Sequence, residues 1–234
     1  QARSRCSRWS LLGMKLSEKH RPTTLDAVVG QEKAIALIRR LQERNAIAGQ
    51  AFLIYSESGR GKTSLARILA SMVADKLYVR EVPGAVLSAK DVWDWFIAAQ
   101  QDTLFGNGGH ALIVNELPTR ERKDTIDVFL HVLENLPPTA IVIFTLTVDG
   151  LDLFKHAKLD SAPFLSRCIQ IKLSDRDLCN PFADLAQRIA KEENLDGQDI
   201  EAYRALCKQE RNNMRSVLNR IETGCMLKST ETNA

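Results

Sequence analysis

Residues 52–70 have the sequence Phe-Leu-Ile-Tyr-Ser-Glu-Ser-Gly-Arg-Gly-Lys-Thr-Ser-Leu-Ala-Arg-Ile-Leu-Ala, and this stretch decides the fold. It begins with an apolar run at 52–55, continues through a turn rich in small residues, and ends in an amphipathic segment. These patterns predict a buried strand, a loop and a helix in that order. The fold class that we predict is α/β, with a parallel sheet flanked by helices.

The loop that follows the apolar run has the spacing of a phosphate-binding P-loop, except that Ser56 occupies the position of the leading glycine. Gly59 and Gly61 allow backbone angles that point successive N–H groups at a polyphosphate, and the next helix adds its positive dipole end. We expect Lys62 to contact the β- and γ-phosphates of ATP and the Thr63 hydroxyl to bind Mg²⁺. The loop residues expected to bind the nucleotide are Ser56, Gly59, Arg60, Gly61, Lys62, Thr63 and Ser64. The alternative, a strand–helix turn with a chance Lys-Thr pair, is disfavoured by the strand before it and the helix after it.

The composition is that of a globular protein and excludes several classes. Apolar residues make up 44% and charged residues 26% of 234 residues, enough for one large or two small domains. The net charge of +3 requires that any nucleic-acid contact come from a local patch. Five scattered cysteines without a CxxC pair argue against a zinc site and a disulfide scaffold, so we expect a cytoplasmic protein. No apolar run approaches the roughly 20 residues that a membrane helix needs.

Residues 1–13 differ from the rest of the sequence. They are rich in arginine, and Met14 precedes a segment that is typical of a natural start. We interpret 1–13 as an appended or upstream-translated basic leader that is disordered. A basic arm that contacts nucleic acid is the alternative.

Continuous apolar runs predict further strands at 111–116 and 140–145, alternation of apolar and polar residues predicts one at 169–173, and 77–82 is a further predicted strand. The run at 111–116 ends in Asn115 and Glu116, the pattern of a central parallel strand that delivers polar side chains to the carboxyl edge of a sheet. The aromatic residues of 91–101 are predicted to pack a helix against the sheet, with base stacking as the less favoured alternative.

The segment at residues 19–31, Lys-His-Arg-Pro-Thr-Thr-Leu-Asp-Ala-Val-Val-Gly-Gln, resembles the opening of the AAA+ clamp-loader ATPases. This family includes the small subunits of replication factor C and the loader subunits of bacterial DNA polymerase III. The resemblance covers roughly residues 15–227 and keeps the family's motifs in their order. In the family this opening surrounds the adenine base, and the matching positions here are Arg21, Pro22, Val28, Val29 and Gly30.

The resemblance implies an AAA+ core of the P-loop NTPase type at residues 14–175, followed by a small all-helical lid domain at 176–234. Predicted helices at 182–191, 199–208 and 213–227 agree with such a lid. The phrase at 212–219 is similar to the family's sensor-2 motif, which places Arg215 over the γ-phosphate.

Other catalytic positions also follow from the resemblance. The strand at 111–116 matches the Walker B segment, in which Glu116 polarises the attacking water and Asn115 replaces the aspartate that organises Mg²⁺. A neutral amide accepts hydrogen bonds from metal-bound water but adds no charge, so we expect slower hydrolysis and expect Asn115→Asp to raise it. Thr147 is nearest to the sensor-1 position. Arg167, in Ser-Arg-Cys, matches the finger that reaches the ATP of a neighbouring subunit, with an ordinary surface arginine as the alternative.

The resemblance also implies partners. These are other AAA+ subunits in a homo- or hetero-oligomer, a sliding clamp, and double-stranded or primed DNA. The basic cluster Arg120, Arg122 and Lys123 matches the DNA-facing helix of the loaders, and a solvated helix face is an equally favoured alternative. Loader subunits also carry a helical collar domain, which the resemblance does not reach. We expect that the subunit assembles through AAA+ contacts alone, that the collar is missing from this fragment, or that the ring partner is another protein.

Two functions of different classes remain open. The first is an ATP-driven clamp-loader-like subunit in DNA replication or repair, with weakened hydrolysis. The second is an adaptor subunit of a loader-like assembly that binds ATP but does not hydrolyse it. A Holliday-junction or replication-restart AAA+ protein is a third class. It is less favoured, because proteins of that class share the motor core but not the Ser-Arg-Cys phrase found here.

Overall fold

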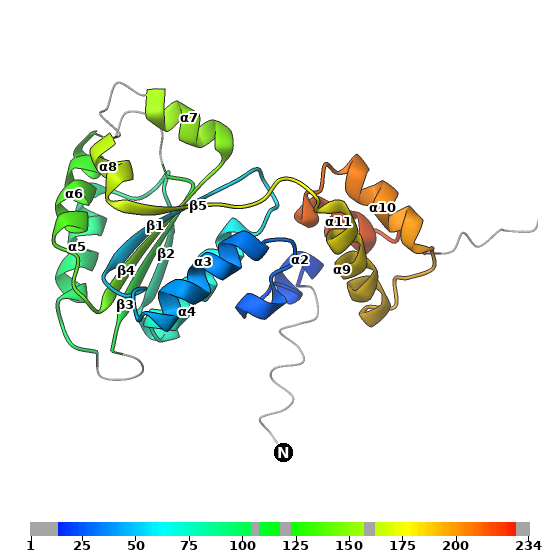
Figure 1. Cartoon of the computed structure of the whole chain (residues 1–234), viewed down its shortest axis with the longest axis horizontal. Helices are drawn as coiled ribbons and strands as arrows, with labels where there is room; N and C mark the ends of the chain where they lie inside the picture. The colour runs from blue at the N-terminus through cyan, green and yellow to red at the C-terminus, as the bar shows by residue number, and fades with distance from the viewer. Residues whose placement is uncertain (1–13, 104–107, 118–122, 157–161, 228–234) are drawn as a thin grey trace, which may run out of the picture. The chain divides into compact units, whose positions relative to one another are not determined.

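The computed structural model describes residues 14–103, 108–117, 123–156 and 162–227. They form two compact units (Figure 1): an α/β unit of residues 23–174, and a helical unit of 14–22 with 175–227. The leader expected at 1–13 lies outside the described residues. In the part of the chain that is described, every helix is too short or too polar to cross a lipid bilayer.

The α/β unit is built on a parallel sheet. Its strands in the described residues are β1 (Gln50–Tyr55), β2 (Val79–Pro83), β3 (His110–Asn115), β4 (Ala140–Leu146) and β5 (Cys168–Lys172). Their spatial order is β2-β3-β4-β1-β5, and every neighbouring pair is parallel. Because all strands run in one direction, their carboxyl ends lie at one edge of the sheet.

Side-chain alternation along the strands divides the core into two layers. Leu53 belongs to one buried cluster, whereas its neighbours Phe52 and Ile54 belong to the other, as expected for a strand covered on both faces. Figure 1 shows helices on both sides of the sheet. One layer contains α3 (Glu32–Glu43) and α4 (Lys62–Val73), and the other contains α5 (Ala89–Ala99), α6 (Lys123–Glu134) and α8 (Ala162–Ser166). The remaining helical elements of the unit are η1 (Leu25–Ala27), η2 (Lys76–Tyr78) and α7 (Val148–His156).

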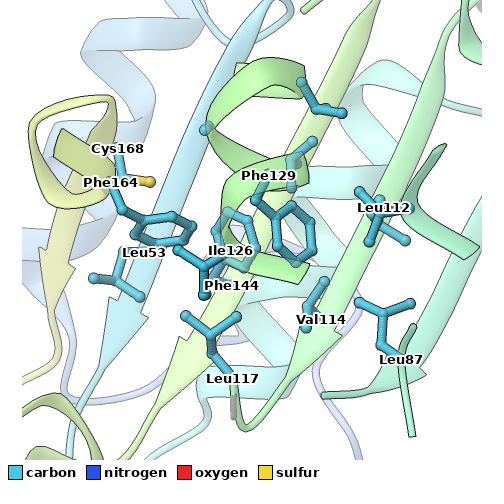
Figure 2. Close-up of a cluster of buried hydrophobic side chains, with 14 of the residues drawn as sticks. Leu53, Leu87, Leu112, Val114, Leu117, Ile126, Phe129, Phe144, Phe164 and Cys168 are labelled. Atoms are coloured by element: carbon cyan, nitrogen blue, oxygen red, sulfur yellow. The ribbon is translucent and has the colours of Figure 1, made fainter. Parts of the chain in front are cut away.

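Aromatic rings fill the layer beneath α6 and α8 (Figure 2). Phe144 of β4 lies between Phe129 and Phe164, with ring centroids 4.9 and 4.8 Å away in edge-to-face geometry. On α5, Trp95 and Phe96 are buried, as predicted for a helix packed on the sheet, while Trp93 remains 42% exposed.

The helical unit contains α2 (Leu16–Lys19), α9 (Cys179–Glu192), α10 (Ile200–Gln209) and α11 (Met214–Glu222). Asp199 and Asn213 cap α10 and α11 through hydrogen bonds to the backbone N–H groups three residues later. The helix predicted at 213–227 ends earlier, at Glu222, because Gly224 takes a left-handed φ of 83° and turns the chain.

Residues 14–22 cluster with the helical unit, although the sequence analysis grouped them with the core. Lys19 Nζ lies 2.7 Å from Glu193 Oε1, and His20 Nε2 is 2.6 Å from the same oxygen. The hydrogen bond from Lys19 is the main cause that lowers the pKa of the Glu193 carboxyl below its usual value. These contacts attach the start of the described chain to the end of α9.

The two-sided core gives a test of the fold. Leu53→Ala removes a fully buried side chain from β1 and is expected to lower the free energy of unfolding by about 2–5 kcal/mol. The same substitution at Leu77, which is 79% exposed, is expected to change it by less than about 0.5 kcal/mol. Urea denaturation followed by circular dichroism measures both, and equal losses for the two variants would contradict this packing.

Candidate nucleotide-binding site

The loop between β1 and α4 has the backbone of an anion-binding turn. Gly59 and Gly61 have φ angles of 75° and 96°, in the region that glycine adopts without strain. Helix α4 begins directly after Gly61, and no described side chain caps it. A Cβ atom added to Gly61 would meet nothing within 4 Å, so the space beside the helix start is open. Open space at a positive helix end suits a phosphate group.

Lys62 is buried and spans this loop. Its Nζ donates to the backbone oxygens of Ser56 at 3.1 Å and Glu57 at 2.9 Å. These bonds direct the ammonium group back across the loop to its first two residues. The serine that replaces the leading glycine is fully buried, and its hydroxyl donates to Glu57 O at 3.0 Å.

Asn115 lies beside Thr63 at the carboxyl edge of the sheet. The Thr63 hydroxyl donates to Asn115 Oδ1 at 3.4 Å, and the Thr145 hydroxyl donates to the same oxygen at 3.3 Å. Strands β3 and β4 and helix α4 therefore bring three polar side chains together. Hydroxyl and amide oxygens are hard ligands of the kind that Mg²⁺ and its bound waters prefer, so these residues fit the metal of a bound nucleotide.

Glu81 of β2, which the sequence did not mark as a candidate, completes this network. Asn115 Nδ2 donates to Glu81 Oε1 at 2.7 Å. The register pairs Glu81 with Ile113, and Asn115 follows Ile113 by two residues, so Glu81 and Asn115 share one face of the sheet. Arg67 of α4 holds the carboxylate with two bonds, from Nε to Oε2 at 2.6 Å and from a terminal nitrogen to Oε1 at 3.1 Å. No local motif marks Glu81, because its role depends on strand pairing.

Glu116 is exposed and has a left-handed φ of 55°, which is unusual for a residue with a side chain. Its N–H donates to Thr145 Oγ1 at 3.1 Å, and Leu117 N–H donates to Thr145 O at 3.1 Å. Thr145 therefore fixes the turn that presents Glu116. A backbone angle of this kind is tolerated where surrounding bonds enforce it, and such positions concentrate at functional sites.

Thr147, predicted at the sensor-1 position, lies two residues beyond Thr145. Its hydroxyl accepts a hydrogen bond from Gly150 N–H at 3.0 Å and so caps α7. In the structure the β4 hydroxyl that contacts Asn115 and the Glu116 backbone belongs to Thr145. The sensor role of Thr147 stays a prediction.

Arg167 follows α8. It donates to Pro163 O at 2.6 Å and forms an ion pair with Glu134 of α6. The neighbouring Cys168 belongs to the buried core, and burial raises the pKa of its thiol to about 12. The finger role of Arg167, which concerns a second subunit, stays a prediction.

The predicted adenine-binding residues fall in both units. Val28, Val29 and Gly30 belong to the α/β unit, whereas Arg21 and Pro22 belong to the helical unit, as does Arg215. Arg21 donates from Nε to Glu18 Oε2 at 3.1 Å. The roles of all six residues stay predictions.

Gln31, which follows the predicted adenine-binding residues, is buried. Its side chain accepts a hydrogen bond from Ser174 N–H at 2.6 Å and donates to Ser174 O at 3.3 Å, which ties the start of α3 to the end of the α/β unit.

Of the basic cluster predicted to contact DNA, Arg120 and Arg122 lie outside the described residues, and Lys123 begins α6.

Comparison with solved structures finds similarity to a single-substitution variant of RuvB from Thermotoga maritima. The TM-score is 0.66 at 21% sequence identity, over 86% of this chain and 64% of the RuvB chain. The chain thus spans less than two thirds of the length of that protein. A scan of protein-family models and a search of curated proteins each gave no match.

This similarity shows the fold. Together with the strand order β2-β3-β4-β1-β5 of a parallel sheet and the C-terminal helices, it confirms the predicted fold class, an α/β core flanked by helices and followed by a small helical domain.

The network gives a test at Thr145, which is 1% exposed. Thr145→Val keeps the shape of the side chain but leaves the Glu116 N–H and the Asn115 oxygen without this hydroxyl, so we expect a loss of about 1–3 kcal/mol in unfolding free energy. Thr145→Ser keeps the hydroxyl and is expected to lose about 0.8 kcal/mol for one buried methyl group. Urea denaturation of both variants measures this, and a Val variant as stable as the wild type would contradict the network.

Proposed function

We propose that this protein binds ATP with Mg²⁺ and acts as a clamp-loader-like AAA+ subunit in DNA replication or repair, with weakened hydrolysis. The observation that carries the proposal is the meeting of the Lys62 loop, the Thr63 hydroxyl and the Asn115 amide at one edge of the sheet. The AAA+ fold supports nucleotide binding in general, and the order of motifs in the sequence supports the loader family.

In this function each candidate site residue has a separate role. The loop amides and Lys62 bind the phosphates, and Thr63 and Asn115 hold the metal and its waters. When bound, Mg²⁺ neutralises charge that develops on the phosphate oxygens. Glu116 accepts a proton from the attacking water, and Arg167 of a neighbouring subunit stabilises the transition state with its guanidinium group.

Weakened hydrolysis follows from the neutral residue in the Walker B position. Asn115 orients metal-bound water through Oδ1, but contributes no negative charge to the metal shell. The same observation supports the second candidate, an adaptor that binds ATP without hydrolysing it. Fold similarity does not separate the two candidates, because both use the same core.

Nucleotide binding is tested at Lys62. Lys62→Ala is expected to raise the dissociation constant of a fluorescent ATP analogue at least about 10-fold, because the loop loses its phosphate-contacting charge. Lys76→Ala is the matched control: Lys76 is exposed and precedes β2, so it lies at the opposite edge of the sheet, and its affinity should equal that of the wild type. Wild-type protein without affinity for ATP would refute the proposed function.

Hydrolysis separates the two candidates. We expect a slow steady-state ATPase rate that primed DNA increases, and we expect Glu116→Gln to remove this rate while nucleotide affinity is retained. Particle mass measured with and without ATP and Mg²⁺ reports whether subunits assemble. A wild-type rate equal to that of Glu116→Gln, with ATP bound in both, would favour the adaptor.

A further inference from the structure

Glu81 faces Asn115 across the two neighbouring strands in a geometry that restricts what each group can do. A carboxylate oxygen only accepts hydrogen bonds, so the contact at 2.7 Å requires the amide nitrogen of Asn115 to point at Glu81. The amide oxygen must then point the other way, where it accepts from the hydroxyls of Thr63 and Thr145. One contact thus sets the orientation of the whole amide group.

The carboxylate is itself held in place. Both oxygens of Glu81 are bound by the fork of Arg67, one turn along α4 from Thr63. Glu81 therefore cannot rotate away from Asn115 without losing a bidentate ion pair. The chain of contacts Arg67–Glu81–Asn115 links helix α4 to the end of β3 through Glu81 of β2, and it ends at the Asn115 oxygen beside Thr63.

We infer that Glu81 is a positioning residue for the metal of bound ATP, since it orients and polarises the Asn115 amide so that Oδ1 serves the Mg²⁺ shell. This inference rests on the proposed function. A hydrogen bond from the amide N–H to a carboxylate moves electron density toward the amide oxygen, which strengthens that oxygen as an acceptor from metal-bound water. Groups that orient metal-binding residues in this way affect metal affinity by about 10–100-fold.

The arrangement also changes how the Walker B substitution should be interpreted. The sequence alone favours Asn115→Asp as a gain of function. In the structure this substitution sets a second carboxylate against Glu81, in a contact where one partner must donate. The informative variant is therefore the double substitution Glu81→Gln with Asn115→Asp, in which the amide and the carboxylate exchange places and the hydrogen bond is kept with its direction reversed.

The test compares nucleotide affinity with and without metal. A fluorescent ATP analogue is titrated into the full chain in EDTA and then at a series of Mg²⁺ concentrations, for wild type, Glu81→Gln and the double variant. We expect the affinity of Glu81→Gln for the analogue in EDTA to stay within about twofold of the wild-type affinity. The Mg²⁺ concentration that gives half of the metal-dependent gain in affinity should rise about 10-fold. The double variant should return the Mg²⁺ requirement to the wild-type value or below it.

Glu43→Gln is the matched control. It removes the same charge from an exposed position at the end of α3 and should leave both titrations unchanged. An unchanged Mg²⁺ requirement in Glu81→Gln overturns the inference, as does a double variant that is not rescued. A parallel loss of affinity in EDTA and in Mg²⁺ indicates a purely structural role for Glu81 and also overturns it. The proposed function fails separately, by an absence of ATP binding in the wild type.

Discussion

The parallel pairing of β1 with β4, and of β4 with β3, is the constraint on which the site depends. In this register Tyr55 pairs with Leu146, and Val114 pairs with Phe144, so the three strands end at almost the same level. The candidate site residues lie at these ends: the Lys62 loop follows β1, Thr145 lies near the end of β4, and Asn115 and Glu116 lie at the end of β3. A shift of one residue in either pairing would turn these side chains to the other face.

A neutral amide at the end of β3 makes the site depend on its neighbours more than a carboxylate would. An amide has one donor end and one acceptor end, so its function requires that both ends be correctly matched. Here the two hydroxyls of Thr63 and Thr145 occupy the acceptor end, and the Glu81 carboxylate occupies the donor end. Four elements of the fold thus determine the direction of a single oxygen atom.

The core beneath the carboxyl edge of the sheet is closely packed on both faces. Alternate side chains of β1 and β4 enter two separate buried clusters, and the aromatic layer around Phe144 fixes the side that faces α6 and α8. Thr145 follows Phe144 directly, so its side chain points to the opposite face, away from the aromatic layer. Dense packing of Phe144 on one face therefore fixes the position of the Thr145 hydroxyl on the other face. This hydroxyl contacts Asn115 and the backbone N–H of Glu116.

The sequence by itself determined the local features: the strand, loop and helix around Lys62, the existence of the other strands, and the polar ends of β3. Such features depend on residues within about ten positions of one another, where hydrophobic period and glycine placement carry the information. The tertiary structure alone decided the contact of Glu81 with Asn115, the contact of the Thr145 hydroxyl with Asn115, and the clustering of residues 14–22 with the helical unit. These contacts join residues about 30 or more positions apart, and they exist only because strand register and helix packing bring those positions together.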